Sequence, residues 1–295
     1  MEHQVFRKFG SPSLYECVSE CLTSSVCRSF AFQHKTQTCF LNNNSSAQLN
    51  ISLRSGFDFS DIQQWTKALI GPCAVVSCPS ANSCHVDRHG RATCVPEFTG
   101  CGHPPHVPFA SVTYDGHYMG AVATYACEKD YTACHQGNTS VCQASGEWEN
   151  VTSHCCKFRW RNTNVNGQYH LPCGPQSKFN VLILATPNAT TRCSVNLWAG
   201  EDVTFHSDFR FTFGKFKNVT VINAKFRHRW GKEMSAPQPL TVGEESEIQI
   251  SLSKGVYMLV VDGSTIIRFH ERQGVQPDRL YLSDGFTLRV TKITV

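Results

Sequence analysis

The segment 205–211 alternates apolar and polar side chains. Its apolar positions are Phe205, Phe209 and Phe211, with Ser207 interrupting them, and its polar positions are His206, Asp208 and Arg210. Because successive side chains of a strand point to opposite faces, the pattern predicts a strand with an apolar back and a polar face. The polar face, the side that carries His206, Asp208 and Arg210, is therefore the first candidate for a binding site.

Alternating segments continue to the end of the chain. They are residues 246–252, 257–261, 265–269 and 286–295, separated by short turns rich in Gly, Asp and Ser. Such spacing predicts an antiparallel β-sandwich over residues 165–295, with no helix of any length. In its last strand, Phe286, Leu288 and Val290 are expected to share one face.

The first half of the chain has a different texture, dominated by cysteine. Cys17 and Cys21 are one helical turn apart, which predicts a short helix, and the strand-like segment 28–32 follows. The 16 cysteines of the 295 residues are an even number in closely spaced sets. This indicates a disulfide framework from an oxidising compartment. Zinc is the competing interpretation, but no CxxC pair occurs, and the HxxH at 103–106 lies in a proline-rich turn.

Glycosylation sequons support the same compartment. They are Asn43, Asn44, Asn50, Asn138, Asn150, Asn188 and Asn218. The first thirty residues contain no signal-peptide core, and no run is long and apolar enough for a membrane span. We therefore expect a secreted, extracellular protein whose sequence here is a mature or trimmed chain.

Residues 1–66 resemble a PAN/apple module, on the evidence of LYECVSECLTSSVCRSFAFQHKTQTCFL. The resemblance implies the bridges Cys17–Cys39 and Cys21–Cys27, and a binding or spacing role. Residues 70–100 resemble a truncated EGF-like module, which implies Cys73–Cys84 and Cys78–Cys94. The fragment GPCAVVSC lacks the carboxylates of calcium-binding variants, so a spacer is expected.

Residues 101–156 resemble a sushi (complement-control) module. The features are the opening CGHPP, the Tyr-x-Cys at 125–127, the Gly-x-Trp ending at Trp148 and the closing Cys155. They imply Cys101–Cys142 and Cys127–Cys155, with Trp148 in the core. We expect the four remaining cysteines to pair as Cys134–Cys156 and Cys173–Cys193.

The order His-x-Asx-x-Arg, Val-x-Asn, Trp-Gly-x-Glu resembles the carbohydrate-recognition signature of galectins, and so implies a galectin-like jelly roll. The matching residues are His206, Asp208, Arg210, Val221, Asn223, Trp230 and Glu233. The resemblance implies that Trp230 stacks on the apolar face of galactose and that Val221 packs beneath the sugar edge.

The polar residues of the signature have implied roles in reading hydroxyl groups. His206 and Arg210 are expected to donate to the axial 4-hydroxyl of galactose, and Asn223 and Glu233 to bond the 6-hydroxyl. Asp208 and Glu233 are also expected to orient Arg210. We further expect Arg210 and Trp230 to be exposed, so that replacing either leaves the core intact.

Two positions depart from the galectin pattern. Asp208 replaces the usual Asn, which removes an amide donor and adds a negative charge. Ser235 stands where a second Arg commonly grips the sugar on the reducing side of galactose. The galactose subsite is therefore expected to be intact, and the adjoining subsite altered.

The expected function is a secreted mosaic lectin that binds β-galactoside glycans. The alternative is an extracellular interaction or matrix protein whose lectin-like domain no longer binds galactosides, or binds acidic glycans through the basic cluster of Lys225, Arg227, Arg229 and Lys232. A protein partner for the three front modules fits either view. The formal charge of +4 is too small to indicate nucleic acid.

No enzyme, cofactor or metal is expected. The chain has no Gly-x-Ser-x-Gly, P-loop or phosphate-binding glycine run. Asp208 and Glu233 resemble a glycosidase pair, but the arginine between them would keep both ionised and leave no general acid.

Overall fold

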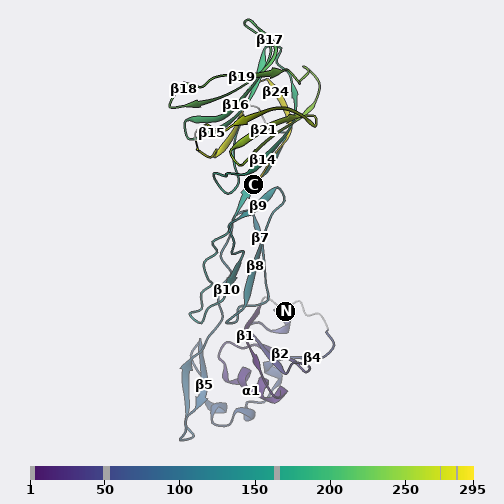
Figure 1. The fold of residues 1–295 in the computed structure, drawn as a ribbon. Helices are drawn as coiled ribbons and strands as arrows, with labels where there is room; N and C mark the ends of the chain where they lie inside the picture. Colours follow the sequence, from purple (N-terminus) through teal and green to yellow (C-terminus); the bar gives the residue numbers. More distant parts are fainter. Residues whose placement is uncertain (1–3, 49–53, 163–166, 273, 284) are drawn as a thin grey trace. The chain divides into compact units, whose positions relative to one another are not determined.

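A computed structural model describes residues 4–48, 54–162, 167–272, 274–283 and 285–295 (Figure 1). The chain divides into two compact units, residues 1–126 with 136–153, and residues 127–135 with 154–295. Each unit is described by itself. The sequon at Asn50 lies outside the described residues.

The N-terminal module of the first unit is a four-stranded sheet with one helix. Its strands are β1 (Val5–Gly10), β2 (Ser29–Gln33), β3 (Thr38–Asn42) and β4 (Phe57–Asp61), in the order β1-β3-β2-β4. Helix α1 (Leu14–Thr23) is capped by Ser13, whose side chain accepts from the Glu16 backbone N–H. The predicted helical turn is correct, because α1 buries both Cys17 and Cys21 against the sheet.

A hairpin of β5 (Asn82–Val86) and β6 (Ala92–Pro96) follows the 3₁₀ segment Lys67–Val75. It contacts the N-terminal module through hydrogen bonds between Ser25 and Asn82 and through the carboxylate of Glu97. Glu97 Oε1 accepts from Ser24 Oγ at 3.0 Å and from the Ser25 backbone N–H at 3.0 Å. The hairpin is therefore attached at its far end as well as through the chain. The EGF-like assignment of residues 70–100 stays a prediction.

The sushi-like module contributes β7 (Ala110–Tyr114), β8 (Val122–Cys127) and β10 (Thr139–Val141). Trp148 packs against two small clusters of buried residues, and its Nε1–H donates to the Gly102 carbonyl at 2.7 Å. Trp148 is thus a core residue, as predicted.

The second unit begins with the pair β9 (Tyr131–Cys134) and β11 (His154–Lys157) and continues into two large sheets. The six-stranded sheet has the order β12-β24-β14-β20-β21-β22, and the seven-stranded sheet the order β13-β23-β15-β16-β17-β18, with β19 beside β17. The strands of the first are Arg159–Arg161, Phe286–Thr294, Phe179–Pro187, Ser246–Ser253, Val256–Val261 and Ser264–His270. Those of the second are Gln168–His170, Arg279–Leu282, Arg192–Ala199, Asp202–Phe213, Phe216–Phe226, Arg229–Trp230 and Met234–Pro237.

The inner faces of the two sheets form one hydrophobic core. Phe205, Phe209 and Phe211 belong to it, as their alternation predicts. Tyr257 is fully buried and donates to Thr204 Oγ1 at 3.0 Å, which satisfies its hydroxyl. This C-terminal sandwich confirms the mainly β, multi-domain fold class.

Two details of the sandwich differ from the prediction. Its first strand, β12, starts at Arg159, before the predicted boundary at 165. In β24 the register against β14 shifts after Leu288, so that Val290 is only half-buried and Thr291 points inward. This bulge was not visible in the alternation, because an extra residue exchanges the two faces of a strand.

Six disulfides have the pairings that the module resemblances imply: Cys17–Cys39, Cys21–Cys27, Cys73–Cys84, Cys78–Cys94, Cys101–Cys142 and Cys127–Cys155. The expected pairs Cys134–Cys156 and Cys173–Cys193 are wrong. Cys134 pairs with Cys173, and Cys156 and Cys193 are free thiols. Cys193 points into the sandwich core, out of reach of the cysteines near β9.

No described helix is both long and apolar enough to cross a membrane.

Candidate functional site

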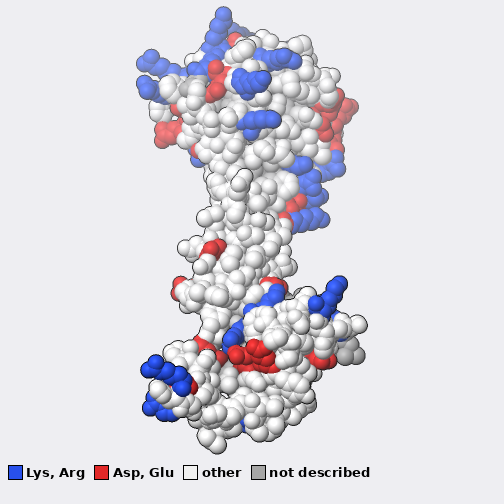
Figure 2. Space-filling model, turned by 60° about the horizontal axis from the view of Figure 1, so that its bottom comes forward, with Lys and Arg blue, Asp and Glu red and all other residues white. Residues whose placement is uncertain are grey.

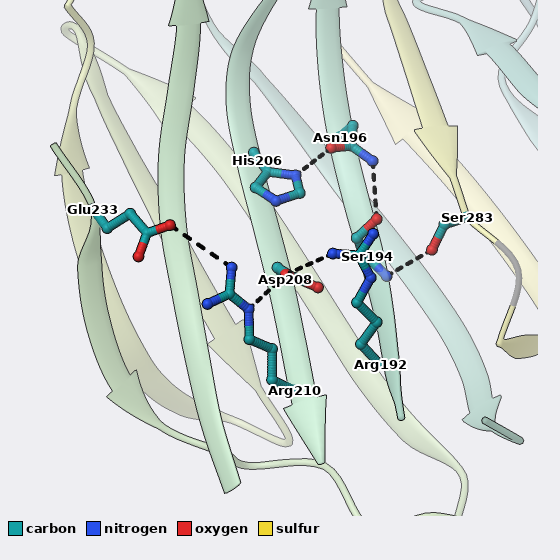
Figure 3. Close-up of polar contacts among 8 residues, drawn as sticks. All are labelled: Arg192, Ser194, Asn196, His206, Asp208, Arg210, Glu233 and Ser283. Carbon is teal, nitrogen blue, oxygen red and sulfur yellow. Dashed lines mark hydrogen bonds and ion pairs between the residues drawn. The ribbon is translucent and has the colours of Figure 1, made fainter. Parts of the chain in front are cut away.

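The polar face lies on the seven-stranded sheet, opposite the core. Strand β16 carries its central row between β15 and β17 (Figure 3). The cross-strand partners are Asn196 and Asn223 for His206, Ser194 and Val221 for Asp208, and Arg192 and Val219 for Arg210. Cross-strand partners share a face, so the site extends over three strands.

Asp208 and Arg210 form the centre of this face. Arg210 Nε donates to Asp208 Oδ2 at 2.7 Å, and Arg210 Nη2 lies 3.7 Å from Glu233 Oε1. Arg192 Nη1 reaches the same Asp208 oxygen at 3.5 Å. Asp208 and Glu233 thus hold the Arg210 guanidinium between them, as the sequence predicts.

The prediction that Arg210 is exposed is wrong, because only 8% of the residue is accessible. Asp208 is fully buried, and a buried carboxylate is stable only when a cation is buried beside it. The guanidinium of Arg210 also lies 5.7 Å from the ring centroid of Phe213. Arg210 therefore contributes to the fold as well as to the face.

One oxygen of the buried carboxylate has no partner in the described residues. Asp208 Oδ2 takes both guanidinium contacts, whereas Oδ1 accepts no hydrogen bond. Buried oxygens in native proteins are almost always paired with protein, water or ligand. Asp208 Oδ1 is therefore an unsatisfied acceptor that is enclosed beneath the face.

His206 is neutral, with a defined tautomer. Asn196 Nδ2 donates to Ser194 Oγ, so Asn196 Oδ1 accepts from His206 Nδ1–H. Burial lowers the pKa of His206 to about 4, and the nearby Asp208 only partly opposes that effect. The unprotonated Nε2 is then an acceptor. In this tautomer Nε2 offers an acceptor to a ligand, whereas the sequence analysis expected His206 to donate to a hydroxyl.

Trp230 supplies the apolar part of the site. It is the last residue of the short strand β18 and is 51% exposed, as predicted. Its ring centroid lies 4.9 Å from that of His206. An exposed indole beside a row of hydrogen-bonding groups can contact a ligand with one apolar and one polar side.

Asn223 holds the Trp230 segment in place. Its Nδ2 donates to the Gly231 carbonyl at 3.0 Å, and its Oδ1 accepts from the Ala224 backbone N–H. A Cβ at position 231 would lie 2.5 Å from Arg272 Nη1, so Arg272 approaches this glycine closely. Asn223 is thus engaged by the protein itself, and positions Trp230 in addition to any role toward a ligand.

The remaining signature positions lie at the edge of the face. Val221 is buried beneath it, opposite Asp208 on one side and Ser235 on the other. Glu233 and Ser235 are exposed beside it. The structure therefore brings all seven signature residues to one face.

The sequence analysis missed contributions from β15 and from residue 272. Arg192 and Asn196 alternate with the buried Cys193 and Val195, and this period of two could have identified them. Arg272 had no such signal, because it follows β22 of the other sheet and reaches Gly231 only through the fold.

A small cavity lies farther along the seven-stranded sheet. It measures about 140 Å³ and is lined by Gln168, Trp198, Arg279 and Tyr281 from three neighbouring strands. Trp198 Nε1 is buried there without a hydrogen-bond partner.

The basic cluster occupies the turn between β17 and β18. Arg227 and His228 both have positive φ, as two-residue hairpin turns require, and Lys225 pairs with Trp230 across the hairpin. Arg227, Arg229 and Lys232 are exposed. Figure 2 shows Lys and Arg side chains projecting from the surface of the molecule.

The described sequons are mostly accessible. Asn43, Asn138, Asn150, Asn188 and Asn218 are exposed. Asn44 is half-buried, and its amide donates to Gln4 Oε1 at 3.1 Å. The five exposed positions remain candidates for glycans.

Comparison with protein families gives three matches. Residues 154–293 match the model of the galactoside-binding lectins, residues 1–62 that of the PAN domain, and residues 101–155 that of the sushi repeat.

Two curated relatives share half of the chain. The rat protein named Sushi, von Willebrand factor type A, EGF and pentraxin domain-containing protein 1 is 28% identical over 166 residues, which is 50% of this chain and 4% of the rat protein. Its mouse counterpart is 28% identical over 160 residues, with the same coverage. The chain thus matches only a small part of these long proteins.

Solved structures with a similar chain path are galectins. The Caenorhabditis elegans galectin LEC-6 is 17% identical, with a TM-score of 0.42, over 46% of this chain and 96% of its own. Sheep galectin-11, in complex with glycerol, is 18% identical, with a TM-score of 0.39, over 44% of this chain and 98% of its own.

Proposed function

Because the chain carries a PAN domain, a sushi repeat and a galactoside-binding lectin domain, we propose that it is a secreted lectin that binds β-galactoside glycans through its polar face. The observation that carries the proposal is that two side chains of the polar face have opposite hydrogen-bonding roles. His206 Nε2 accepts and the Arg210 guanidinium donates, four residues apart on one strand face beside Trp230, with Asp208 between them.

This arrangement suits the axial 4-hydroxyl of galactose. A hydroxyl donates one hydrogen bond and accepts others, so it can donate to His206 Nε2 and accept from Arg210. An equatorial 4-hydroxyl would point away from this pair and leave buried polar groups unpaired, which is costly. The proposed site therefore discriminates between galactose and glucose.

Two further groups extend the contact. Trp230 is free to stack on the C–H face of the sugar. Glu233, exposed and 3.7 Å from Arg210, is placed to accept from the 6-hydroxyl.

The sugar contact needs no cation. Both carboxylates of the face lie beside Arg210, so binding is expected to survive EDTA. A lectin that holds sugar through calcium would need several carboxylates around one ion.

The test is retention of the full chain on immobilised lactose and its release by free lactose, with maltose as the control sugar. Trp230→Ala is expected to abolish retention. Phe226→Ala is the matched control. Phe226 is also exposed on the β17–β18 hairpin, but its side chain lies on the opposite side of the strand from the polar face. Equal retention of wild type and Trp230→Ala would refute the proposal.

The alternative role has a separate outcome in the same experiment. The wild-type chain would then not be retained on lactose but would bind immobilised heparin. If an Arg227→Ala/Arg229→Ala variant loses that binding, the basic cluster is the functional surface. The chain would then recognise acidic glycans or act as a matrix protein.

A further inference from the structure

Three cysteines of the second unit form a cluster that the lectin function does not use. The Sγ atoms of Cys134, Cys156 and Cys173 all lie within 4.8 Å of one another. Cys134 and Cys173 are bonded, and Cys156 is a free thiol. A cluster of three cysteines can hold one disulfide at a time, so one of its members always keeps a thiol.

We propose that this cluster is a site of intramolecular thiol–disulfide exchange. The Cys156 thiolate attacks Cys134 Sγ, the Cys134–Cys173 bond breaks, a Cys134–Cys156 bond forms, and Cys173 leaves as a thiolate that takes up the proton lost by Cys156. One disulfide and one thiol are present before and after, so the step needs no external oxidant or reductant.

Burial selects this direction of attack. Cys134 is fully buried, whereas Cys156 and Cys173 are both half-buried. An apolar environment disfavours a thiolate, so the sulfur that leaves is the more solvated Cys173. Cys134 therefore stays bonded in both states, and the thiol alternates between positions 156 and 173.

The two states link different segments of the chain. The Cys134–Cys173 bond joins β9 to the segment between β13 and β14, whereas a Cys134–Cys156 bond joins the neighbouring strands β9 and β11. Leu171 stays docked in either state through its N–H on the Asp278 carbonyl at 2.8 Å. Exchange thus frees the residues after Leu171 from β9 without undocking β13.

The second free thiol provides an internal control. Cys193 lies in the sandwich core, and burial raises the pKa of its thiol well above the ordinary value. It is expected to stay unmodified in folded protein, whichever state the cluster adopts.

The experiment follows the cluster in the oxidised full chain. Protein is incubated without reductant at pH 8, quenched with acid, alkylated with N-ethylmaleimide and mapped by mass spectrometry without reduction. We expect two populations: Cys134–Cys173 with alkylated Cys156, and Cys134–Cys156 with alkylated Cys173. Exchange should slow as the pH falls, because the thiolate is the attacking species, and its rate should not depend on protein concentration.

Two variants make the result decisive. Cys156→Ser removes the nucleophile and should show only Cys134–Cys173, whereas Cys173→Ser should form Cys134–Cys156. Alkylation of Cys156 alone at every time point in the wild type would overturn the proposal, as would disulfide-linked dimers through Cys156 that rise with concentration. If Cys173→Ser does not fold, the time course of the wild type decides.

Discussion

The front modules and the C-terminal sandwich are stabilised in different ways. In the N-terminal module, the main cluster of described buried residues has nine members, of which four are disulfide-bonded cysteines. In the sandwich, the corresponding cluster has 27 members, and its one cysteine is the unbonded Cys193. The front modules therefore depend on covalent links where apolar area is scarce, whereas the sandwich depends on packing.

This difference indicates which region can change its binding residues with the smaller loss of stability. A packed sandwich tolerates buried charges on its outer face, since the core beneath it remains intact. A module with a small core has no such reserve.

Reduction should have the largest effect and should separate the two regions. The Cys101–Cys142 bond closes a loop of 41 residues, worth about 4 kcal/mol in the chain-entropy model. We expect a strong reductant to unfold the sushi-like module, as seen by calorimetry, while lactose retention persists. Loss of both together would show that the sandwich also depends on disulfides.

Arg210→Ala should come next, because it acts on fold and site together. Removing the guanidinium leaves the buried Asp208 with only the Arg192 contact at 3.5 Å. The variant should lose lactose retention and about 3 kcal/mol of unfolding free energy in urea. Trp230→Ala should lose retention with little change in stability, so an equal loss in both variants would contradict the burial argument.

A change of pH should act on His206 more weakly. Its folded pKa, about 4, lies below the unfolded value near 6.5, so the unfolded chain takes up the proton first as the pH falls. This contribution to stability is complete above pH 6.5 and is lost between pH 6.5 and 4. We expect about 2 kcal/mol less stability at pH 5 than at pH 7, and a smaller difference in His206→Gln.

Retention on lactose should depend on the protonation of His206 in the folded protein. Lactose binding by folded protein should be constant from pH 8 to about 5 and decline toward pH 4, where Nε2 becomes a donor. Decline near pH 6.5 would mean that His206 is not buried as described.

Ser235→Arg should have the smallest effect, confined to the second sugar. Ser235 is exposed at the edge of the face, opposite Val221, where a guanidinium has room. One added charged hydrogen bond is worth about 1 kcal/mol, or roughly fivefold in affinity. Calorimetry should show the gain for N-acetyllactosamine and none for galactose.

Much of the fold was predictable from local patterns and from resemblance to known modules. The strand alternation predicted the sandwich, and the module resemblances implied six bridges. Pairing across modules was not predictable, since the approach of Cys173 to Cys134 depends on how β13 and β9 fold together. The bulge before Val290 was not predicted for the same reason, because it is defined only by the pairing of β24 with β14.

The site followed the same rule. The period of two placed His206, Asp208 and Arg210 on one face, and the galectin resemblance added the other signature residues. Burial, tautomer and neighbours could not be predicted. Arg210 is buried because Asp208 is, and His206 is an acceptor because Asn196 faces it from another strand.

The contacts of Glu97 bear on how the molecule responds to proteases. Glu97 binds Ser24 and Ser25, and the His117 N–H donates to the Val5 carbonyl at 2.7 Å, so the N-terminal module is attached at two further points. Leu69, in the connection, is exposed. A cut there would nick the chain without releasing a fragment, and the two pieces would separate only in denaturant.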